Sequence, residues 1–336
     1  MNTSLRPESV WKSDNISGGP PLVSLIVTSY SSGRLRDLTD LLMSVAIQEP
    51  IDLIDLIVVI ERERSLFEKV VTVLTSLPKL NSSVLFYSNL NGMSGARNVG
   101  AAASSAKYVA FVDDDTILEK EWLRSFRETV NNNDVVAITG PSHSLWTGSR
   151  LGWFPRELSW LVGSTEWFDC ESLTEVRNMW GHNMAVRRYE FLAVNGFSEG
   201  LGLHSVSRSR WFDPPSEDVD ISLRLRKKFR IPILYVPGFG VRHKVPLRKI
   251  SLAFVAQRSY STGYQRRAIK DESSAMIHSR KNSLYIERDL IPRMILLLPK
   301  SFVAIPKSLT KSMNIITIIF VAMLFSLLGY CDRRSY

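Results

Sequence analysis

Residues 108–115 read YVAFVDDD, an apolar run that ends in three consecutive aspartates. The run has the length and the β-branched and aromatic content of a buried strand, so the aspartates would lie at a strand end. Three like charges there repel one another unless positive charge lies among them. A divalent cation would supply it, and hard carboxylate oxygens favour Mg²⁺ or Mn²⁺ over zinc. An acidic turn before the next helix is the alternative interpretation.

Strand geometry predicts the directions of these three side chains. Residues two apart along a strand point to the same side. We therefore expect Asp113 and Asp115 to share one face, with Asp114 pointing to the other.

Strands of this kind alternate with amphipathic helices along the chain. Apolar runs predict strands at residues 22–28, 55–60, 83–87, 108–112, 134–139, 178–188, 231–236 and 239–243. Three-to-four spacing, or small residues in one case, predicts helices at residues 34–48, 65–77, 96–106, 119–132, 216–229 and 247–263. This order predicts an α/β fold with a doubly wound sheet, helices on both faces, and ligands beyond the carboxyl ends of the strands.

Composition and charge limit the possible classes of protein. The 336 residues are 45% hydrophobic, which is enough for the core of one large domain or two smaller ones. The two cysteines, Cys170 and Cys331, lie far apart, which argues against a disulfide framework. The net charge of +9 is concentrated after residue 220. Such a surface suits diphosphates, anionic lipid or nucleic acid, and a solvated surface of mixed charge is the commoner explanation.

The two ends of the chain differ in character. Residues 1–19 are polar with no apolar signal region, so we expect the protein to start in the cytosol. Residues 315–331 read IITIIFVAMLFSLLGYC, long enough for a membrane span, although a buried core helix fits the same pattern. Three flanking lysines, Lys300, Lys307 and Lys311, outweigh Arg333 and Arg334 and favour a cytoplasmic globular part. Residues 290–306 are apolar but interrupted by prolines and charges, which predicts an interfacial segment.

Six motifs in a fixed order resemble the family 2 glycosyltransferases of the GT-A type, over about residues 22–268. They are VSLIVTSY at 23–30, NGMSGARNVG at 91–100, FVDDDT at 111–116, GHNMAVRR at 181–188, SEDVDISLRL at 216–225 and VRH at 241–243. The resemblance implies a GT-A-type, mostly parallel but mixed sheet with membrane-associated helices after it. The expected divisions are a leader at 1–20, a catalytic domain at 21–270, a linker with the interfacial segment at 271–312, a transmembrane helix at 313–331 and a tail at 332–336.

The resemblance also implies roles for individual residues. In the family an acidic strand end holds the Mg²⁺ or Mn²⁺ that bridges the donor diphosphate, which assigns Asp113, Asp115 and His243 to the metal. The nucleotide would contact Thr28, Ser29, Tyr30, Glu61, Arg97, Asp113 and Asp114. Donor and acceptor contacts would come from Trp180, Gly181, His182, Asn183, Glu217 and Arg258. The family usually has aspartate where this chain has Glu61, which leaves uridine, guanosine and thymidine nucleotides open.

Asp218 matches the position of the family's general base. A carboxylate there would accept the proton of the acceptor hydroxyl in a single displacement that inverts the anomeric centre. A first-turn acidic residue that only stabilises the helix is the alternative. Processive members carry glutamine, two spacers, arginine and tryptophan, and neither Gln257 nor Gln265 begins that pattern. This difference favours a single addition.

The resulting expectation is a single-pass cell-membrane enzyme with its catalytic domain in the cytoplasm. It would transfer a sugar from a UDP-, GDP- or dTDP-linked donor to an acceptor hydroxyl, with a lipid-linked saccharide favoured and no nucleic-acid partner. A nucleotidyltransferase that acts on sugar phosphates is one alternative, but residues 28–38, TSYSSGRLRDL, hold no lysine and only one glycine for a phosphate loop. A non-catalytic membrane-anchored scaffold with the same fold is the other.

Overall fold

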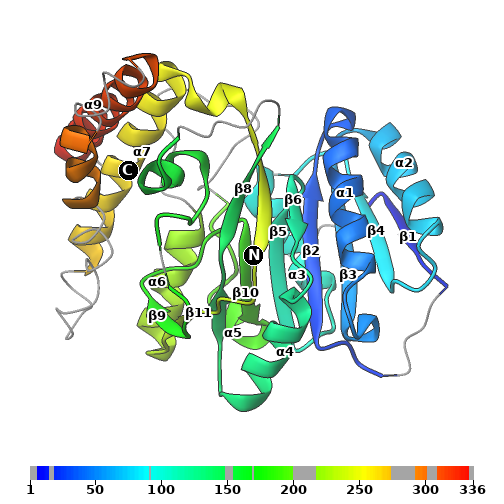
Figure 1. Ribbon diagram of the computed structural model, residues 1–336. Helices are drawn as coiled ribbons and strands as arrows, with labels where there is room; N and C mark the ends of the chain where they lie inside the picture. Colours follow the sequence, from blue (N-terminus) through cyan, green and yellow to red (C-terminus); the bar gives the residue numbers. More distant parts are fainter. Residues whose placement is uncertain are drawn as a thin grey trace. The chain divides into compact units, whose positions relative to one another are not determined.

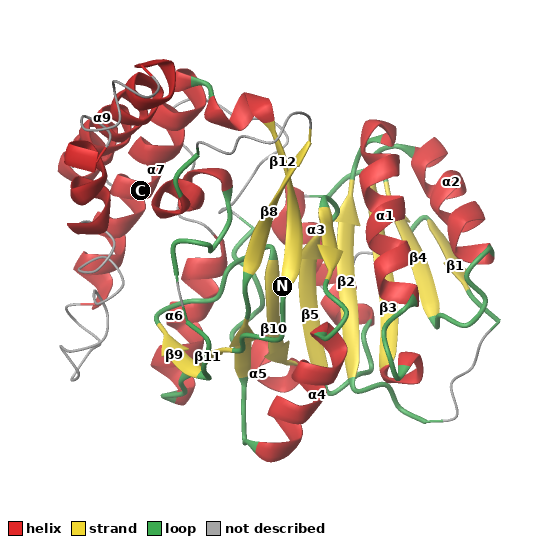
Figure 2. Ribbon diagram, in the orientation of Figure 1, coloured by secondary structure: helices red, strands yellow, loops and turns green. Residues whose placement is uncertain are grey.

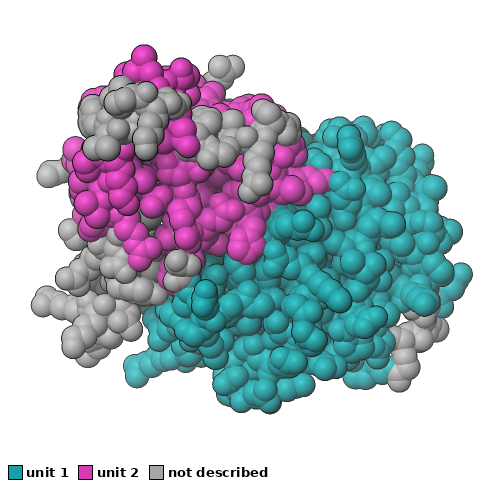
Figure 3. Space-filling view, in the orientation of Figure 1, with its two compact units in different colours: residues 1–141, 170–206, 216–242 teal, residues 142–169, 207–215, 243–336 magenta. Residues whose placement is uncertain are grey.

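The central sheet is built from the apolar runs that predict buried strands (Figure 1). The computed structural model describes residues 6–14, 19–90, 92–147, 154–168, 170–199, 217–273, 292–300 and 309–332, with side chains to residue 267 in the helix that ends at 273. These residues form two compact units (Figure 3). The first unit comprises residues 1–141, 170–206 and 216–242, and the second comprises 142–169, 207–215 and 243–336.

Nine strands form one mixed sheet in the first unit, in the order β1-β4-β3-β2-β5-β10-β7-β11-β9 (Figure 2). The four neighbours β4, β3, β2 and β5 are parallel, whereas β1 and β10 flank them antiparallel. The strands are β1 (Ser9–Lys12), β2 (Val23–Ser29), β3 (Ile54–Glu61), β4 (Ser82–Tyr87), β5 (Tyr108–Asp113), β7 (Ala137–Thr139), β9 (Thr174–Val176), β10 (Asn183–Arg187) and β11 (Ile233–Tyr235). This confirms the predicted mixed α/β sheet. Its eight neighbour pairs are four parallel and four antiparallel, so the sheet is less parallel than predicted.

Helices cover both faces of this sheet. The first unit contains α1 (Leu35–Ala46), α2 (Arg64–Thr75), α3 (Gly92–Ala103), α4 (Trp122–Asn132), α5 (Arg188–Ala193) and α6 (Glu217–Phe229), with short 3₁₀ turns η1 (Ser32–Arg34) and η2 (Ile51–Leu53). On one face, Leu25 of β2 shares a core cluster with residues of α1, α2 and α4. Its neighbour Ile26 points the other way and contacts α3, where a side chain at Gly100 would come within 2.6 Å of it. The absence of a side chain at Gly100 therefore lets α3 approach the sheet closely.

The second unit has its own core beneath the carboxyl-terminal helices. It contains β8 (Ser142–Thr147), η3 (Arg156–Val162), η4 (Leu247–Ile250), α7 (Leu252–Ser273), a helical stretch at 292–300 and α9 (Leu309–Cys331). A second sheet has the order β6-β12-β8, with β6 at Thr116–Leu118 and β12 at Val241–Pro246. The boundary between the two units, after Arg242, falls within β12. Within the described part of the chain, α9 is the one helix long and apolar enough to cross a membrane, with a mean hydropathy of 2.1.

Two glycines bring α7 and α9 into direct backbone contact. A side chain at Gly263 of α7 would overlap the carbonyl of Ser326, and one at Gly329 of α9 would overlap the carbonyl of Tyr260. Arg267 also donates from Nη1 to the Tyr330 carbonyl at 3.3 Å. The predicted helix at 247–263 is therefore a 3₁₀ turn followed by a longer helix that packs along α9.

Some predicted segments differ or fall outside the described residues. The leader contains β1, a short edge strand that pairs antiparallel with β4. Of the predicted interfacial segment, only residues 292–300 are described, and there Met294 is buried while Ile295 and Leu296 are exposed. Residues 200–216, including the start of the SEDVDISLRL motif, and the tail after residue 332 lie outside the described part.

Candidate active site

The carboxyl ends of β2, β3 and β5 meet at one edge of the first unit's sheet. In the strand register, Thr28 lies beside Asp113, and Glu61 is the last residue of β3. Burial raises the pKa of the Glu61 carboxyl, although the neighbouring Arg62 opposes this shift. Tyr30, just beyond β2, is half exposed and has the Arg34 guanidinium 5.8 Å from its ring centre. These predicted nucleotide-contacting residues therefore lie at one sheet edge.

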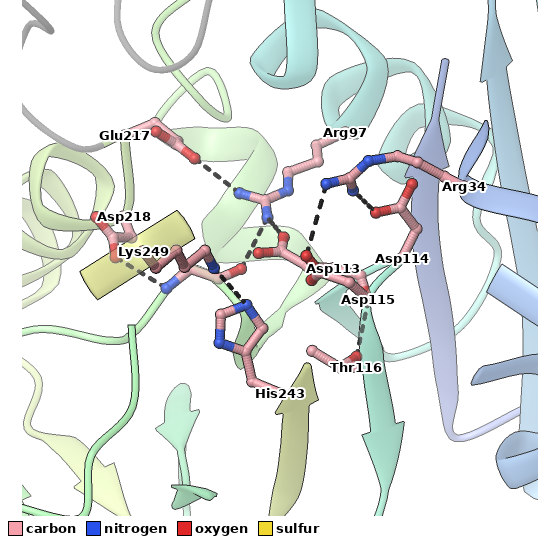
Figure 4. A network of polar contacts seen from close by, with 11 residues as sticks. Arg34, Arg97, Asp113, Asp114, Asp115, Thr116, Glu217, Asp218, His243 and Lys249 are labelled. Atoms are coloured by element: carbon pink, nitrogen blue, oxygen red, sulfur yellow. Dashed lines mark hydrogen bonds and ion pairs between the residues drawn. The ribbon is translucent and has the colours of Figure 1, made fainter. Parts of the chain in front are cut away.

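Asp113 continues the alternation of β5 and points toward α3. Phe111, two residues earlier, contacts Phe191 and Phe197 on that face, with ring centres 5.2 and 5.0 Å apart. Arg97 of α3 donates from Nη2 to Asp113 Oδ1 at 2.7 Å (Figure 4). The Asp113 side chain is 31% exposed, which leaves it open to a ligand as well as to the arginine.

Asp114 is buried below this edge. Ser29 donates from Oγ to Asp114 Oδ2 at 2.6 Å, and Arg34 pairs with Asp114 Oδ1. Burial raises the pKa of the Asp114 carboxyl to about 7, while Arg34 and the Ser29 hydrogen bond oppose that shift. With a side chain only 3% exposed, Asp114 supports the site from within the protein. Any nucleotide contact of Ser29 or Asp114 would thus have to form while the two side chains are hydrogen-bonded to each other.

Asp115 lies in a turn rather than in the strand. Strand β5 ends at Asp113, so strand alternation does not set the directions of the two residues that follow. Arg34 contacts Asp114 and also approaches Asp115, with its Nη2 3.5 Å from Asp115 Oδ2. The expectation that Asp115 points to the same side as Asp113 therefore stays a prediction, because strand alternation, its basis, ends at Asp113.

Asp218 lies in the first described turn of α6 and is held by a neighbouring loop. Its Oδ2 accepts a hydrogen bond from the Gly181 N–H at 2.8 Å, and its Oδ1 accepts one from the Val219 N–H at 2.8 Å. One turn later, Ser222 accepts a hydrogen bond from the Met179 N–H at 3.0 Å. Two positions on one face of α6 therefore fix the backbone of residues 179–181.

Arg97 connects this loop to the acidic strand end. Its Nη2 also donates to the Gly181 carbonyl at 2.8 Å, and its Nη1 donates to Glu217 Oε1 at 2.9 Å. Burial raises the pKa of the Glu217 carboxyl, and the Arg97 charge opposes the shift. Asp113, Gly181, Glu217 and Asp218 thus belong to one network of polar contacts (Figure 4).

Asn183, predicted as a donor or acceptor contact, makes its hydrogen bonds within the protein. Its side chain is fully buried, accepts a hydrogen bond from Trp122 Nε1 at 3.0 Å and donates to the Phe239 carbonyl at 2.6 Å. These bonds tie β10 to α4 and to the loop before β12, so Asn183 has a structural role. Trp180 packs edge-on against Tyr235 at 5.6 Å, and His182 is half-buried in the turn before β10.

The second unit holds the remaining predicted residues, His243 and Arg258. His243 is buried, with Lys249 Nζ 3.3 Å from its Nε2, and Gly163 packs against its ring. Gly163 has a φ of +82°, a conformation that favours glycine, and an added Cβ would lie 3.2 Å from His243 Cε1. Arg258 is exposed on α7.

The acidic edge fits a divalent cation in its donor chemistry. Asp113 and Asp115, whose side chains are 31% and 15% exposed, present carboxylate oxygens at this edge, whereas Asp114 and Glu217 are buried. No set of three or more His, Cys, Asp or Glu side chains gathers as a ready metal cage among the described residues. One or two carboxylates completed by substrate phosphates are what Mg²⁺ commonly uses, so the residues present fit an ion shared with a ligand.

The sequence matches two family descriptions. Residues 24–191 match "Glycosyl transferase family 2", and residues 108–330 match "Glycosyl transferase family group 2". The chain belongs to glycosyl transferase family 2. This glycosyltransferase is 28% identical, over 74% of its length and 77% of the relative's, to the glucosyl-dolichyl phosphate glucuronosyltransferase of Haloferax volcanii.

Solved structures share the fold of this family 2 glycosyltransferase. The mannosyltransferase PcManGT from Pyrobaculum calidifontis, solved with GDP-Man and Mn²⁺, superposes with a TM-score of 0.62 at 16% identity, over 97% of this chain and 92% of that one. GalNAc-T7, solved with UDP, GalNAc and Mn²⁺, gives 0.52 at 13% identity, over 81% of this chain and 54% of that one. These likenesses confirm the GT-A-type fold, and family membership excludes the nucleotidyltransferase alternative.

Sequence reasoning about this glycosyltransferase missed Arg34. The sequence argument requires positive charge among the three aspartates, and it assigns that charge to a metal ion alone. Arg34 lies just after β2 in the segment SSGRLRDL, and it pairs with Asp114 across 80 residues of sequence. The available signal was a basic residue at the carboxyl end of the strand that neighbours the acidic one.

Proposed function

We propose that this glycosyltransferase transfers a single sugar, with inversion, from a nucleotide-sugar to a hydroxyl of a lipid-linked saccharide. The name of the Haloferax relative, which is similar over three quarters of the chain, supports a lipid-linked acceptor. The GDP-Man and Mn²⁺ in the Pyrobaculum structure support a nucleotide-sugar donor and a divalent ion.

One observation carries the mechanistic part of this proposal. The candidate base and the candidate metal ligand are joined through two groups, since Asp218 bonds to Gly181 and Arg97 bonds to both Gly181 and Asp113. A displacement needs its base and its leaving-group stabiliser near one reacting carbon. This connection supports a shared reaction site, whereas acidic motifs on separate surfaces would argue against one.

The proposed roles follow from the chemistry of the transfer. Bound to Asp113 and Asp115, Mg²⁺ or Mn²⁺ would offset the negative charge that develops on the departing nucleoside diphosphate. Asp218 accepts the proton of the acceptor hydroxyl as that oxygen attacks the anomeric carbon. Each carboxylate oxygen has more than one lone pair, so the hydrogen bonds from Gly181 and Val219 orient Asp218 without exhausting its capacity to accept a proton.

The donor nucleotide would bind at the carboxyl ends of β2 and β3. Thr28, Tyr30 and Glu61 supply a hydroxyl, an exposed ring and a buried carboxylate at that edge. We infer that Glu61 replaces the family's usual base-contacting aspartate. His243 remains our proposed additional metal contact, and Arg258 our proposed contact to phosphate.

We further propose that α9 attaches the enzyme to the membrane with the catalytic unit in the cytoplasm. Large apolar side chains of α9 are exposed, among them Phe320, Leu324 and Leu327. Such a surface suits lipid better than water. Lysines on its amino-terminal side favour a cytoplasmic location for that side of the helix.

A donor screen tests this proposal. The purified full-length chain in detergent is incubated with Mn²⁺ and UDP-, GDP- and dTDP-linked sugars, and slow donor hydrolysis and thermal stabilisation are measured. We expect one nucleotide class to stabilise the protein and to be hydrolysed only when Mn²⁺ is present. If no nucleotide-sugar is hydrolysed and none stabilises the protein, the result would favour the alternative of a non-catalytic membrane-anchored scaffold.

A further inference from the structure

Arg97 is a charged side chain with almost no contact with solvent. It is 1% exposed, and its guanidinium reaches three different segments of the chain. The partners are Asp113 at the end of β5, the carbonyl of Gly181 before β10, and Glu217 at the described start of α6. Both motifs that carry the proposed chemistry therefore meet at one arginine.

Two further contacts fix the position of that arginine. Phe197 lies beneath it, with the guanidinium carbon 5.5 Å from the ring centre. Asn98, the next residue, holds the Phe197 backbone from both sides, since its Oδ1 accepts from the Phe197 N–H at 2.8 Å and its Nδ2 donates to the Phe197 carbonyl at 2.9 Å. Residues 97 and 98 thus act together, one binding the acidic residues and the other fixing the ring that supports it.

The peptide groups of Gly181 extend this arrangement to Asp218. The Gly181 carbonyl accepts from Arg97, and the Gly181 N–H donates to Asp218 Oδ2. The loop also lies close to the acid, because a Cβ on Gly181 would come within 3.3 Å of Asp218 Oδ2. A shift of the loop by a few tenths of an ångström would therefore move the hydrogen bond that orients Asp218.

We propose that Arg97 is a positioning residue that couples the metal-binding aspartate to the general base. It orients Asp113 directly and Asp218 through the Gly181 loop, rather than holding the nucleotide. This inference rests on the proposed sugar transfer. It differs from a nucleotide contact because the two η-nitrogens of Arg97 are directed at protein oxygens in a buried location.

Arg97→Lys tests the coupling. Lysine keeps the positive charge, but its single ammonium cannot bridge three partners in the fork geometry of arginine. We expect kcat to fall about 100-fold, the size that a misplacement of about 1 Å can produce, while the Kd for the nucleotide measured in a chelator stays within about twofold. Arg187→Lys is the control, since Arg187 is also paired with two carboxylates, Asp134 and Glu190, at the opposite end of β10, although its side chain is 22% exposed. It should leave both quantities near wild type.

A double-mutant cycle separates coupling from a general defect. If Arg97 acts on the reaction through Asp218, Arg97→Lys should slow the Asp218→Asn variant far less than it slows the wild type. Equal effects in both backgrounds, or a large loss of nucleotide affinity in a chelator for Arg97→Lys, would overturn the inference. If Arg97→Lys does not fold, Phe197→Leu removes the supporting ring instead, with the same expected fall in kcat at an unchanged metal-free Kd for the nucleotide.

Measurements on the wild-type enzyme separate a failure of the proposed sugar transfer from a failure of the coupling role of Arg97. If it neither binds nor hydrolyses any nucleotide-sugar in the presence of Mn²⁺, the proposed function itself fails and the variants have no rate to compare. If it is active and Arg97→Lys loses nucleotide binding with kcat retained, only the coupling role fails.

Discussion

A methyl group added at Gly181 perturbs the proposed base without removing any functional group. In Gly181→Ala the new Cβ would lie 3.3 Å from Asp218 Oδ2, 3.4 Å from its Cβ and 3.5 Å from its Cγ. The first of these distances is slightly short, so either the loop or Asp218 must move by a few tenths of an ångström. The N–H that donates to Asp218 remains in place.

The size of the effect follows from that displacement. Misplacing a reacting group by about 1 Å can cost about 100-fold in rate, so a few tenths of an ångström should lower kcat by about 5- to 10-fold. The residue is only partly buried and the overlap is small, so we expect the unfolding free energy to fall by about 1 kcal/mol at most. The donor KM should change little, because the displaced atoms belong to the base.

The assay compares kcat, donor KM and thermal midpoint for wild type, Gly181→Ala and a matched control. Gly19→Ala is that control, since nothing lies within 4 Å of a Cβ at Gly19. A folded Gly181→Ala enzyme with wild-type kcat would refute the reasoning that the loop controls the position of Asp218. A raised donor KM at unchanged kcat would instead indicate that Gly181 contacts the donor.

Three other variants test separate parts of the site. Asp115→Asn should weaken Mn²⁺-dependent nucleotide binding, measured by titration calorimetry, by about 10-fold or more, and should leave the stability of the metal-free protein nearly unchanged. Binding equal to that of wild type would show that Asp115 is not a metal ligand. Asp114→Asn should become more stable relative to wild type as the pH rises from about 4 to 8 in a chelator. The native pKa of about 7 exceeds the ordinary 3.8, so the native state holds the proton more tightly and wild type loses stability across that window, by at most about 4 kcal/mol. A difference in thermal midpoint that does not change with pH would contradict the raised pKa. Asn183→Ala should lower the unfolding free energy by about 2–4 kcal/mol, because the Trp122 N–H and the Phe239 carbonyl lose their buried partners. The nucleotide affinity of the folded fraction should stay the same. A selective loss of that affinity would support a ligand-binding role instead.

The main sheet could be predicted from the sequence because its strands are buried on both faces. Parallel strands such as β2 and β3 then read as continuous apolar runs, which are easily distinguished from amphipathic helices. The edge strand β1 was not predicted, since its residues alternate between half-buried and exposed and its partner β4 lies far along the chain. The short strands β8 and β9 were missed for a similar reason, because neither shows a sustained apolar pattern.

The site could be predicted in its residue types but not in its connections. The order of the acidic motifs identified Asp113 and Asp218 as candidates, whereas the link between them runs through Arg97 and Gly181, which are 84 residues apart. No local pattern records such a pairing. Asn183 was predicted as a ligand contact but is bound within the protein. The sequence cannot distinguish an asparagine that binds a ligand from one that accepts a hydrogen bond from a buried tryptophan.

The transfer rate of Asp218→Asn, measured beside its nucleotide affinity, tests the central claim most directly. Asparagine keeps the size of the side chain and an oxygen for the Gly181 N–H, but it cannot take up the acceptor's proton. We expect the rate of sugar transfer to fall by about 10²–10⁴-fold, with the Mn²⁺-dependent Kd for the donor nucleotide unchanged within about twofold. A folded Asp218→Asn enzyme that transfers sugar at the wild-type rate would contradict the claim.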